Sequence, residues 1–257
     1  MVKSLITIVA PTLNEESNIR FLIESVDRQT NRDAEIVVVD GGSSDETVSI
    51  AESYGVKVIV KRGLKEFPSR NLGATVARGD ILLFTCADAV FPPNLIERIV
   101  EEFRDERLVA ITGPDIPSTS ALAKIEYGVY NFFRWFFSTF PGRSKRFSTS
   151  TNFLAVKKTY FDKTGGFISD VNGDGLMGQK LTAMGKVKFA MDKKVFISSR
   201  RFRKMGFFKF NSHYFYVFEN FFPYLRTTSF LKILKNKSGA VHSDMRQTNG
   251  IDFLEES

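Results

Sequence analysis

The stretch Val37-Val-Val-Asp-Gly-Gly-Ser-Ser-Asp-Glu-Thr47 is a β-branched run that stops at an acid, followed by a glycine turn and a helix-capping sequence. Together with Ile36, the run has no polar alternation, which is typical of a strand covered on both faces of a parallel sheet. Asp40 then stands at the carboxyl end of the strand, where ligands enter open α/β sheets. Gly41 and Gly42 allow a tight turn and close approach of a ligand. By itself, the stretch favours a structural turn with a capping acid over a binding site.

Short apolar runs on either side of this stretch alternate with segments whose apolar residues recur at helical spacing. This alternation predicts a doubly wound α/β sheet. Asp88 also follows an apolar run directly, so we expect Asp40 and Asp88 to share one cleft at the carboxyl edge of the sheet. Asp174 is expected in a glycine-rich loop ahead of a helix over 176–184. Strands are predicted at 4–10, 36–39, 56–60, 81–84, 109–112, 147–156, 187–191 and 195–198, and helices follow most of them, including a short one at 158–163.

An amphipathic helix is predicted between Ala121 and Phe140. Packing of its apolar stripe against the sheet is the favoured interpretation, because buried Phe stripes are common. An interfacial helix or an apolar acceptor groove is the alternative. The stripe consists of Val129, Phe132, Phe133, Phe136, Phe137 and Phe140, and the opposite face carries Asn131, Arg134 and Ser138.

Charge is divided unevenly along the 257 residues. Residues 1–142 hold 15 Lys/Arg and 20 Asp/Glu, a net charge of −5, whereas residues 143–257 hold 21 and 9, a net charge of +12. A basic, aromatic back half indicates a polyanionic partner such as phosphates or an anionic membrane surface. The single Cys86 excludes an intramolecular disulfide and a cysteine-rich zinc site, which favours a reducing compartment. No apolar run approaches ~20 residues, so we expect no membrane-spanning helix.

Five motifs in this order resemble the family 2 glycosyltransferases of the GT-A fold, over about residues 4–191. The resemblance implies a Rossmann-like, doubly wound mixed sheet with helices on both faces. It implies a GT-A domain over 1–198, with a nucleotide-binding front half to about 115 and an acceptor and base part from about 116. Beyond Ser198 the resemblance is thin, and the basic, aromatic composition of residues 199–257 predicts an extension that faces a membrane or a partner. The motifs are Pro11-Thr-Leu-Asn-Glu15, Val39-Asp-Gly-Gly-Ser-Ser-Asp-Glu-Thr47, Arg70-Asn-Leu-Gly73, Ala77-Arg-Gly-Asp80 before the strand that ends at Asp88, and Gly165-Gly-Phe167 before Asp174.

The resemblance also implies roles for individual residues. Asp88 matches the last acid of the D-x-D motif and would ligate Mn²⁺ or Mg²⁺. Asp174 matches the general base that takes the proton of the acceptor hydroxyl. The sequence departs from the pattern at Cys86, in place of the first D-x-D acid, and at Gly173, in place of the acid before the base. The residues that would hold the nucleotide are Pro11, Thr12, Asn14, Glu15, Asp40, Gly42, Arg70, Ala87 and Asp88.

Basic and polar residues of the second half complete the expected site. Arg200, Arg201 and Asn152 are expected at the diphosphate or acceptor, although a solvated basic loop explains the two arginines equally well. His213 could complete the metal shell that Cys86 leaves short, although a lone histidine is more often structural. Asn131-Phe-Phe-Arg-Trp135 resembles a processive-synthase signature, but it precedes the base instead of following it, so we interpret it as coincidence.

The expected activity is therefore transfer of a single sugar, with inversion, from a UDP- or GDP-sugar to a sugar or a polyprenyl-phosphate-linked acceptor. The expected location is cytoplasmic, with peripheral contact to the inner face of the cell membrane. Alternatively, the aromatic surface forms the interface of a homodimer. Nucleic acid is not expected, because no binding motif accompanies the positive charge. A nucleotidyltransferase is disfavoured, because Pro11-Thr-Leu-Asn14 stands where a phosphate-binding glycine loop would be. A non-catalytic nucleotide-sugar-binding protein of the same fold remains the alternative.

Overall fold

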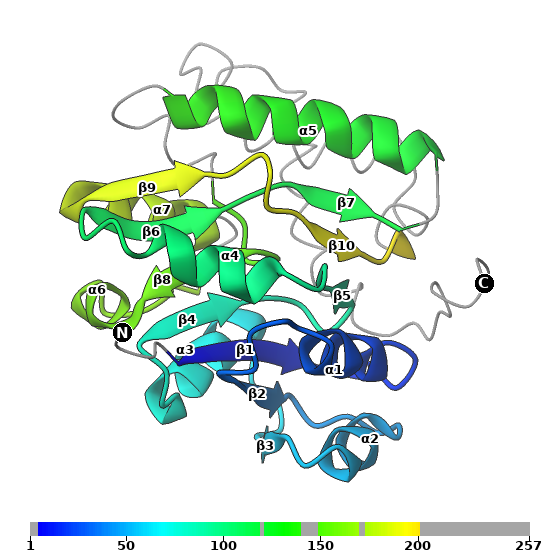
Figure 1. Cartoon of the computed structure of the whole chain (residues 1–257). Coiled ribbons are helices and arrows are strands. Elements are labelled where there is room, and N and C mark those ends of the chain that lie inside the picture. The colour runs from blue at the N-terminus through cyan, green and yellow to red at the C-terminus, as the bar shows by residue number, and fades with distance from the viewer. Residues whose placement is uncertain (1–4, 119–120, 140–148, 170–172, 201–257) are drawn as a thin grey trace, which may run out of the picture.

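The central sheet of the computed structural model has seven strands in the order β3-β2-β1-β4-β8-β6-β9 (Figure 1). The structure describes residues 5–118, 121–139, 149–169 and 173–200. β8 runs antiparallel to both of its neighbours, and the other pairs are parallel, so the mixed α/β sheet of the prediction is confirmed. The strands are β1 Ile6–Thr12, β2 Ala34–Asp40, β3 Lys57–Val60, β4 Ile81–Phe84, β6 Leu108–Thr112, β8 Leu154–Lys157 and β9 Lys186–Phe189.

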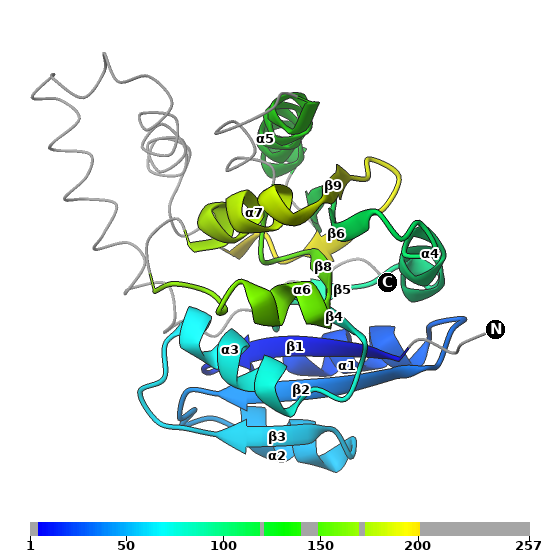
Figure 2. The same cartoon turned by 90° about the vertical axis from the view of Figure 1, so that its left-hand side faces the viewer.

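Helices cover both faces of this sheet (Figures 1 and 2). Alternate strand residues point to opposite faces, so neighbouring apolar residues of one strand enter different cores. Ile8 of β1 packs in the core with α1 and α4, whereas its neighbour Val9 packs in the core with α3, α6 and α7. The helices are α1 Ile19–Asp27, α2 Thr47–Ser53, α3 Glu66–Val76, α4 Leu95–Glu102, α6 Lys158–Lys163 and α7 Gly173–Met184.

A small second sheet, in the order β5-β10-β7, lies beside the carboxyl edge of the main one (Figure 1). It joins β5 (Ala89–Val90), β10 (Val195–Ile197) and β7 (Asp115–Pro117). β10 was predicted from its unbroken apolar run, Val-Phe-Ile. β5 and β7 were not predicted, because β5 has only two residues and β7, Asp-Ile-Pro, is not an apolar run. Through this sheet, β10 brings the residues that follow it back to the loop after β4.

The orientation predicted for the amphipathic helix is wrong. α5 (Ala121–Thr139) turns its polar face inward: Arg134 is 1% exposed, whereas Phe132 is 51% and Val129 54% exposed. The inward face is held by the buried ion pair between Arg134 and Asp115, at 3.3 Å, and by the hydrogen bond that Asn131 donates to the backbone carbonyl of Asp115. A polar face can be buried when its groups find such partners. Phe137 alone of the described stripe is buried.

Several strand boundaries differ by one to three residues from the prediction, and the starts of α7 and β8 differ in ways that affect the site. α7 begins at Gly173, so Asp174 lies in the first turn of the helix and not in a loop ahead of it. β8 begins at Leu154 instead of 147, because residues 150–153 form a turn that is closed by a bridge between Ser150 and Phe153. No helix in the described ranges is both long enough and apolar enough to cross a bilayer. Arg201, His213, Phe140 and nearly all of the proposed 199–257 extension lie outside the described residues, and the domain boundary stays a prediction.

Candidate active site

The loops after β1 and β2 are joined by a dense set of hydrogen bonds around Asp40. The Asp40 carboxylate is fully buried. Its Oδ1 accepts hydrogen bonds from the backbone N–H groups of Gly42 and Ser43, at 2.8 and 2.7 Å, and its Oδ2 accepts from the hydroxyls of Thr12 and Ser43. Gly42 has a φ of +100°, which favours glycine. Asp40 therefore organises the turn, and within the described part of the chain it is not among the residues that line the cleft.

Asn14 holds the same two loops together from the other side. It has a φ of 54°, and its side-chain oxygen accepts a hydrogen bond from the backbone N–H of Ser44 at 2.9 Å. The hydroxyl of Thr47 accepts from the backbone N–H of Glu15 at 2.7 Å. The Val39–Thr47 motif thus positions the backbone that carries Glu15, and Glu15 is the residue that reaches the cleft.

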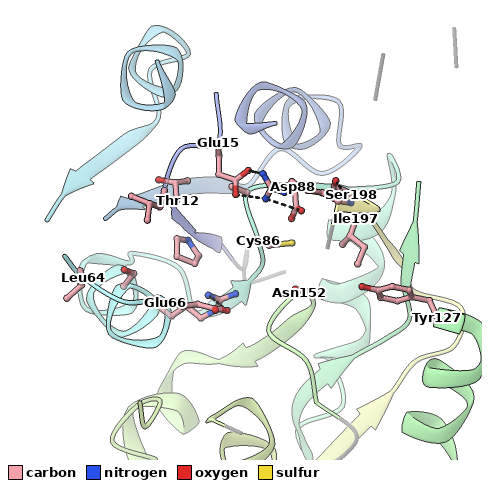
Figure 3. A pocket seen from close by; sticks show the side chains of 16 residues that line it. Thr12, Glu15, Leu64, Glu66, Cys86, Asp88, Tyr127, Asn152, Ile197 and Ser198 are labelled. Atoms are coloured by element: carbon pink, nitrogen blue, oxygen red, sulfur yellow. Dashed lines mark hydrogen bonds and ion pairs between the residues drawn. The ribbon is translucent and has the colours of Figure 1, made fainter. Parts of the chain in front are cut away.

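A cleft lies at the carboxyl ends of β1 and β4 and is closed on one side by the segment after β10 (Figure 3). This is the edge at which open α/β sheets bind ligands. The loop after β1, the start of α3, the loop after β4, α5 and the turn before β8 all contribute walls. The lining residues are Pro11, Thr12, Leu13, Glu15, Leu64, Glu66, Ser69, Arg70, Cys86, Ala87, Asp88, Tyr127, Asn152, Ile197, Ser198 and Arg200.

Arg200 joins two acids of the cleft, Glu15 and Asp88. Its Nη1 and Nη2 donate to the two carboxylate oxygens of Glu15 at 3.0 and 2.6 Å, and its Nη2 lies 3.6 Å from Oδ2 of Asp88. Burial raises the pKa of Glu15, the Arg200 hydrogen bond opposes this rise, and the nearby charge of Asp88 adds to it. The pKa of Arg200 is also raised, because the attraction of the two carboxylates outweighs the effect of its burial.

Arg70 forms the opposite wall from within the protein. It is 1% exposed, and its Nη2 donates to the backbone carbonyls of Thr85 and Thr151, both at 3.1 Å. Its Nη1 lies 3.1 Å from a carboxylate oxygen of Glu66, four residues earlier on α3. Arg70 therefore fastens the end of β4 to the turn before β8. It lines the cleft as predicted from the sequence, but its charge is shared with Glu66.

Asn152 is positioned by a buried cluster beneath α5. The Asn152 side-chain nitrogen donates to Oδ2 of Asp115 at 3.1 Å, and the same oxygen accepts from the Ser150 hydroxyl at 3.1 Å and from Arg134. Tyr127 of α5 lines the same cleft as Asn152 (Figure 3). The inward polar face of α5 thus connects this helix to the wall of the cleft.

Asp174 stands in the first turn of α7, half-buried. Burial raises its pKa to about 6, a backbone hydrogen bond from the N–H of Gly175 opposes the rise, and the charge of Glu66 adds to it. The charges of Arg134 and Arg70 lower the pKa. Glu66 and Arg70 line the cleft, so Asp174 lies within electrostatic reach of that wall. A carboxylate with a pKa near 6 can accept a proton at neutral pH.

A divalent cation was expected at Asp88. The fit is poor, because Cys86 replaces a second carboxylate, and burial and the nearby Asp88 charge raise the pKa of its thiol well above the ordinary value. A neutral thiol is not a ligand for the oxygen-preferring Mn²⁺ or Mg²⁺. Within the described ranges no cluster of three or more His, Cys, Asp or Glu side chains could hold a metal ion. The guanidinium of Arg200 already stands against Asp88.

Most of the residues proposed from the sequence gather in this cleft. Pro11, Thr12, Glu15, Arg70, Ala87, Asp88, Asn152 and Arg200 line it, whereas Asn14, Asp40 and Gly42 lie in the supporting loops. The sequence reasoning missed Tyr127, Glu66, Ser69 and Ser198. Glu66 could have been predicted, because its i, i+4 spacing from Arg70 on a helix indicates an ion pair. Tyr127 had no such signal, because its place depends on how α5 packs.

An acidic and guanidinium-lined cleft at the carboxyl edge of a doubly wound sheet is the arrangement of nucleotide-binding α/β enzymes. Residues 7–164 match the family model described as "Glycosyl transferase family 2", and the chain belongs to this family. The predicted family resemblance is thereby confirmed.

Two curated relatives illustrate the sequence similarity. A "PGL/p-HBAD biosynthesis glycosyltransferase" of Mycobacterium bovis is 32% identical over 141 residues, which cover 52% of each chain. An "O-antigen chain rhamnosyltransferase WbaN" of Salmonella anatum is 25% identical over 172 residues, 63% of this chain and 55% of the relative. The chain thus spans about half the length of these relatives.

Two solved structures share the GT-A fold. The mannosyltransferase PcManGT from Pyrobaculum calidifontis, in complex with GDP-Man and Mn²⁺, has a TM-score of 0.64 at 18% identity and covers 95% of this chain and 72% of its own. S. aureus TarS 1–349, in complex with UDP-GlcNAc, has a TM-score of 0.55 at 18% identity, with coverages of 76% and 58%. The predicted GT-A fold is confirmed.

Proposed function

We propose that the chain transfers a single sugar, with inversion, from a UDP- or GDP-sugar to an acceptor hydroxyl. The observation that carries the proposal is the cleft in which Thr12, Glu15, Asp88 and Arg200 meet at the carboxyl edge of the sheet. A carboxylate can accept the N–H and O–H donors of a nucleoside, and a guanidinium can donate to a diphosphate. The family match and the nucleotide-sugar complexes of PcManGT and TarS support this donor class.

Asp174 is the proposed general base. In the reaction, the acceptor hydroxyl oxygen forms a bond to the anomeric carbon of the sugar as the bond from that carbon to the diphosphate oxygen breaks. The bonding electrons leave with the diphosphate, and the hydroxyl proton passes to Asp174. A pKa of about 6 leaves most of this carboxylate ionised at pH 7, ready to take the proton. No step of this proposal passes through a metal ion, because the described residues fit one poorly.

The acceptor class is a second part of the proposal. The exposed aromatic face of α5, with Phe132 and Trp135, suits contact with a membrane that carries a polyprenyl-phosphate-linked acceptor. Arg143, Lys145 and Arg146 follow this helix in the sequence and suit an anionic surface. Contact of the same face with a second copy of the chain is the alternative.

A donor panel tests the activity. The protein is incubated with UDP-, GDP- and dTDP-sugars, and release of free sugar is measured with and without an added acceptor. Donor-dependent release that is lost in Asp174→Asn, with nucleotide binding unchanged, supports the proposal. Nucleotide binding without release from any donor supports the alternative, a nucleotide-sugar-binding protein of this fold. Near-normal transfer by Asp174→Asn refutes the assignment of the base.

A further inference from the structure

The cation that the structure places against Asp88 is a guanidinium. Arg200 binds both carboxylate oxygens of Glu15, with Nη2 3.6 Å from Asp88, and its side chain is only 17% exposed. The backbone N–H of Arg200 donates to the Ser198 hydroxyl at 3.0 Å, and the backbone N–H of Ser198 donates to the carbonyl of Asp88 at 3.2 Å. β10 and the loop after β4 therefore hold Arg200 where it stands.

A divalent cation and Arg200 compete for the same carboxylate. Both are positively charged, and their mutual repulsion grows as the cleft excludes water. A second acid at position 86 would favour the metal ion in this competition, but a half-buried cysteine stands there instead. The thiol at position 86 leaves Asp88 as a weak metal site, and the guanidinium of Arg200 supplies positive charge at the same carboxylate.

A guanidinium is also suited to the ligand. Its planar arrangement of N–H donors matches the oxygens of a phosphate and can serve several acceptors at once. Binding of a diphosphate therefore does not require Arg200 to leave Glu15.

We propose that Arg200, in place of a divalent cation, supplies the positive charge that binds the donor diphosphate, so that donor binding needs no metal ion. The inference rests on the proposed function for the nature of the donor. It differs from the cofactor expectation that the family resemblance carries. The PcManGT complex contains both GDP-Man and Mn²⁺, whereas in this proposal the cleft binds its donor through a guanidinium.

Binding measurements test the proposal without turnover. Calorimetric titrations with UDP, GDP and inorganic pyrophosphate are made in EDTA and in Mn²⁺, on the whole chain. We expect the wild-type Kd for each bound ligand to agree within about twofold between the two conditions. Arg200→Gln is expected to weaken binding in EDTA by about 10–100-fold, the cost of a charge-assisted hydrogen-bonded pair. Arg200→Lys keeps the charge but not the planar pair of donors, so its Kd in EDTA is expected to lie between those of the wild type and Arg200→Gln.

Arg104→Ala is the matched control, because it removes one exposed arginine after α4, away from the cleft. It is expected to bind like the wild type, and thermal unfolding shows whether each variant is folded. Binding that disappears in EDTA and returns with Mn²⁺, or that Arg200→Gln leaves unchanged, overturns the proposal. Pyrophosphate separates the two hypotheses: pyrophosphate binding that depends on Arg200 while neither nucleotide binds supports the role of Arg200 and refutes the proposed donor. Failure of all three ligands to bind the folded wild type refutes both.

Discussion

The pH dependence of transfer should follow the ionisation of Asp174. Its pKa is raised to about 6, chiefly by burial. A general base works in its ionised form, so activity is present above this pKa and is lost as the pH falls through it. The ionised fraction is about 0.91 at pH 7 and about 0.09 at pH 5 for this pKa, so kcat/KM should fall about tenfold across that interval.

Removal of a charged side chain near Asp174 should move the acidic limb of the pH profile, which is the fall of kcat/KM at low pH. Glu66 raises the pKa of Asp174 by its negative charge, and it is paired with Arg70, whose positive charge lowers the same pKa. Glu66→Gln removes the negative charge that raises the pKa of Asp174. It also leaves Arg70, whose positive charge lowers this pKa, without its partner carboxylate. Both changes favour the ionised form, so the limb should move to lower pH. Glu52→Gln, at an exposed position of α2, is the matched control and should leave the limb in place.

The assay is the initial rate of sugar transfer at low donor concentration, measured between pH 4.5 and 8 in buffers of constant ionic strength, because kcat/KM reports the free protein. The slow residual activity of Asp174→Asn should lack the limb altogether. A limb that persists at the same pH in Asp174→Asn, or that Glu66→Gln shifts to higher pH, would show that another group titrates.

Three further predictions concern stability and surface contact. Asp115→Leu should lower the free energy of unfolding by about 3–5 kcal/mol in urea denaturation, because it leaves the Arg134 charge buried without its partner, whereas the double variant Asp115→Leu/Arg134→Met should recover most of the loss. Gly178→Ala should cost about 1–3 kcal/mol by the same measurement, since its Cβ would lie 2.3 Å from Oγ1 of Thr149, and Thr149→Ala in the same chain should relieve part of it. Trp135 is the single tryptophan and is 38% exposed, so its fluorescence should shift to shorter wavelength when vesicles containing anionic lipid are added, and an unchanged spectrum with the protein sedimenting free of vesicles would contradict membrane contact by α5.

The sequence determined the sheet and the edge at which the cleft lies. An unbroken β-branched run such as 36–39 is typical of a strand buried on both faces of an α/β sheet, and the polar residues that end β1 and β4 then meet at one edge. This information lies in the order of residues along the chain. The motifs were therefore sufficient to predict that Thr12, Glu15 and Asp88 stand at this edge of the sheet, and to predict the family.

The tertiary structure decided which motif residues reach the cleft. Asn14 belongs to the same motif as Glu15, and Asp40 belongs to the Val39–Thr47 motif, but both side chains are used in joining two loops. A buried carboxylate such as that of Asp40 is stable only where N–H and O–H donors surround it. The inward polar face of α5 depends on Asp115, 19 residues from Arg134, and a helical period alone does not specify which face finds partners. Arg200 meets Glu15 across 185 residues of chain. Such pairings between distant residues depend on the packing of β10 against the loop after β4, and no local pattern records them.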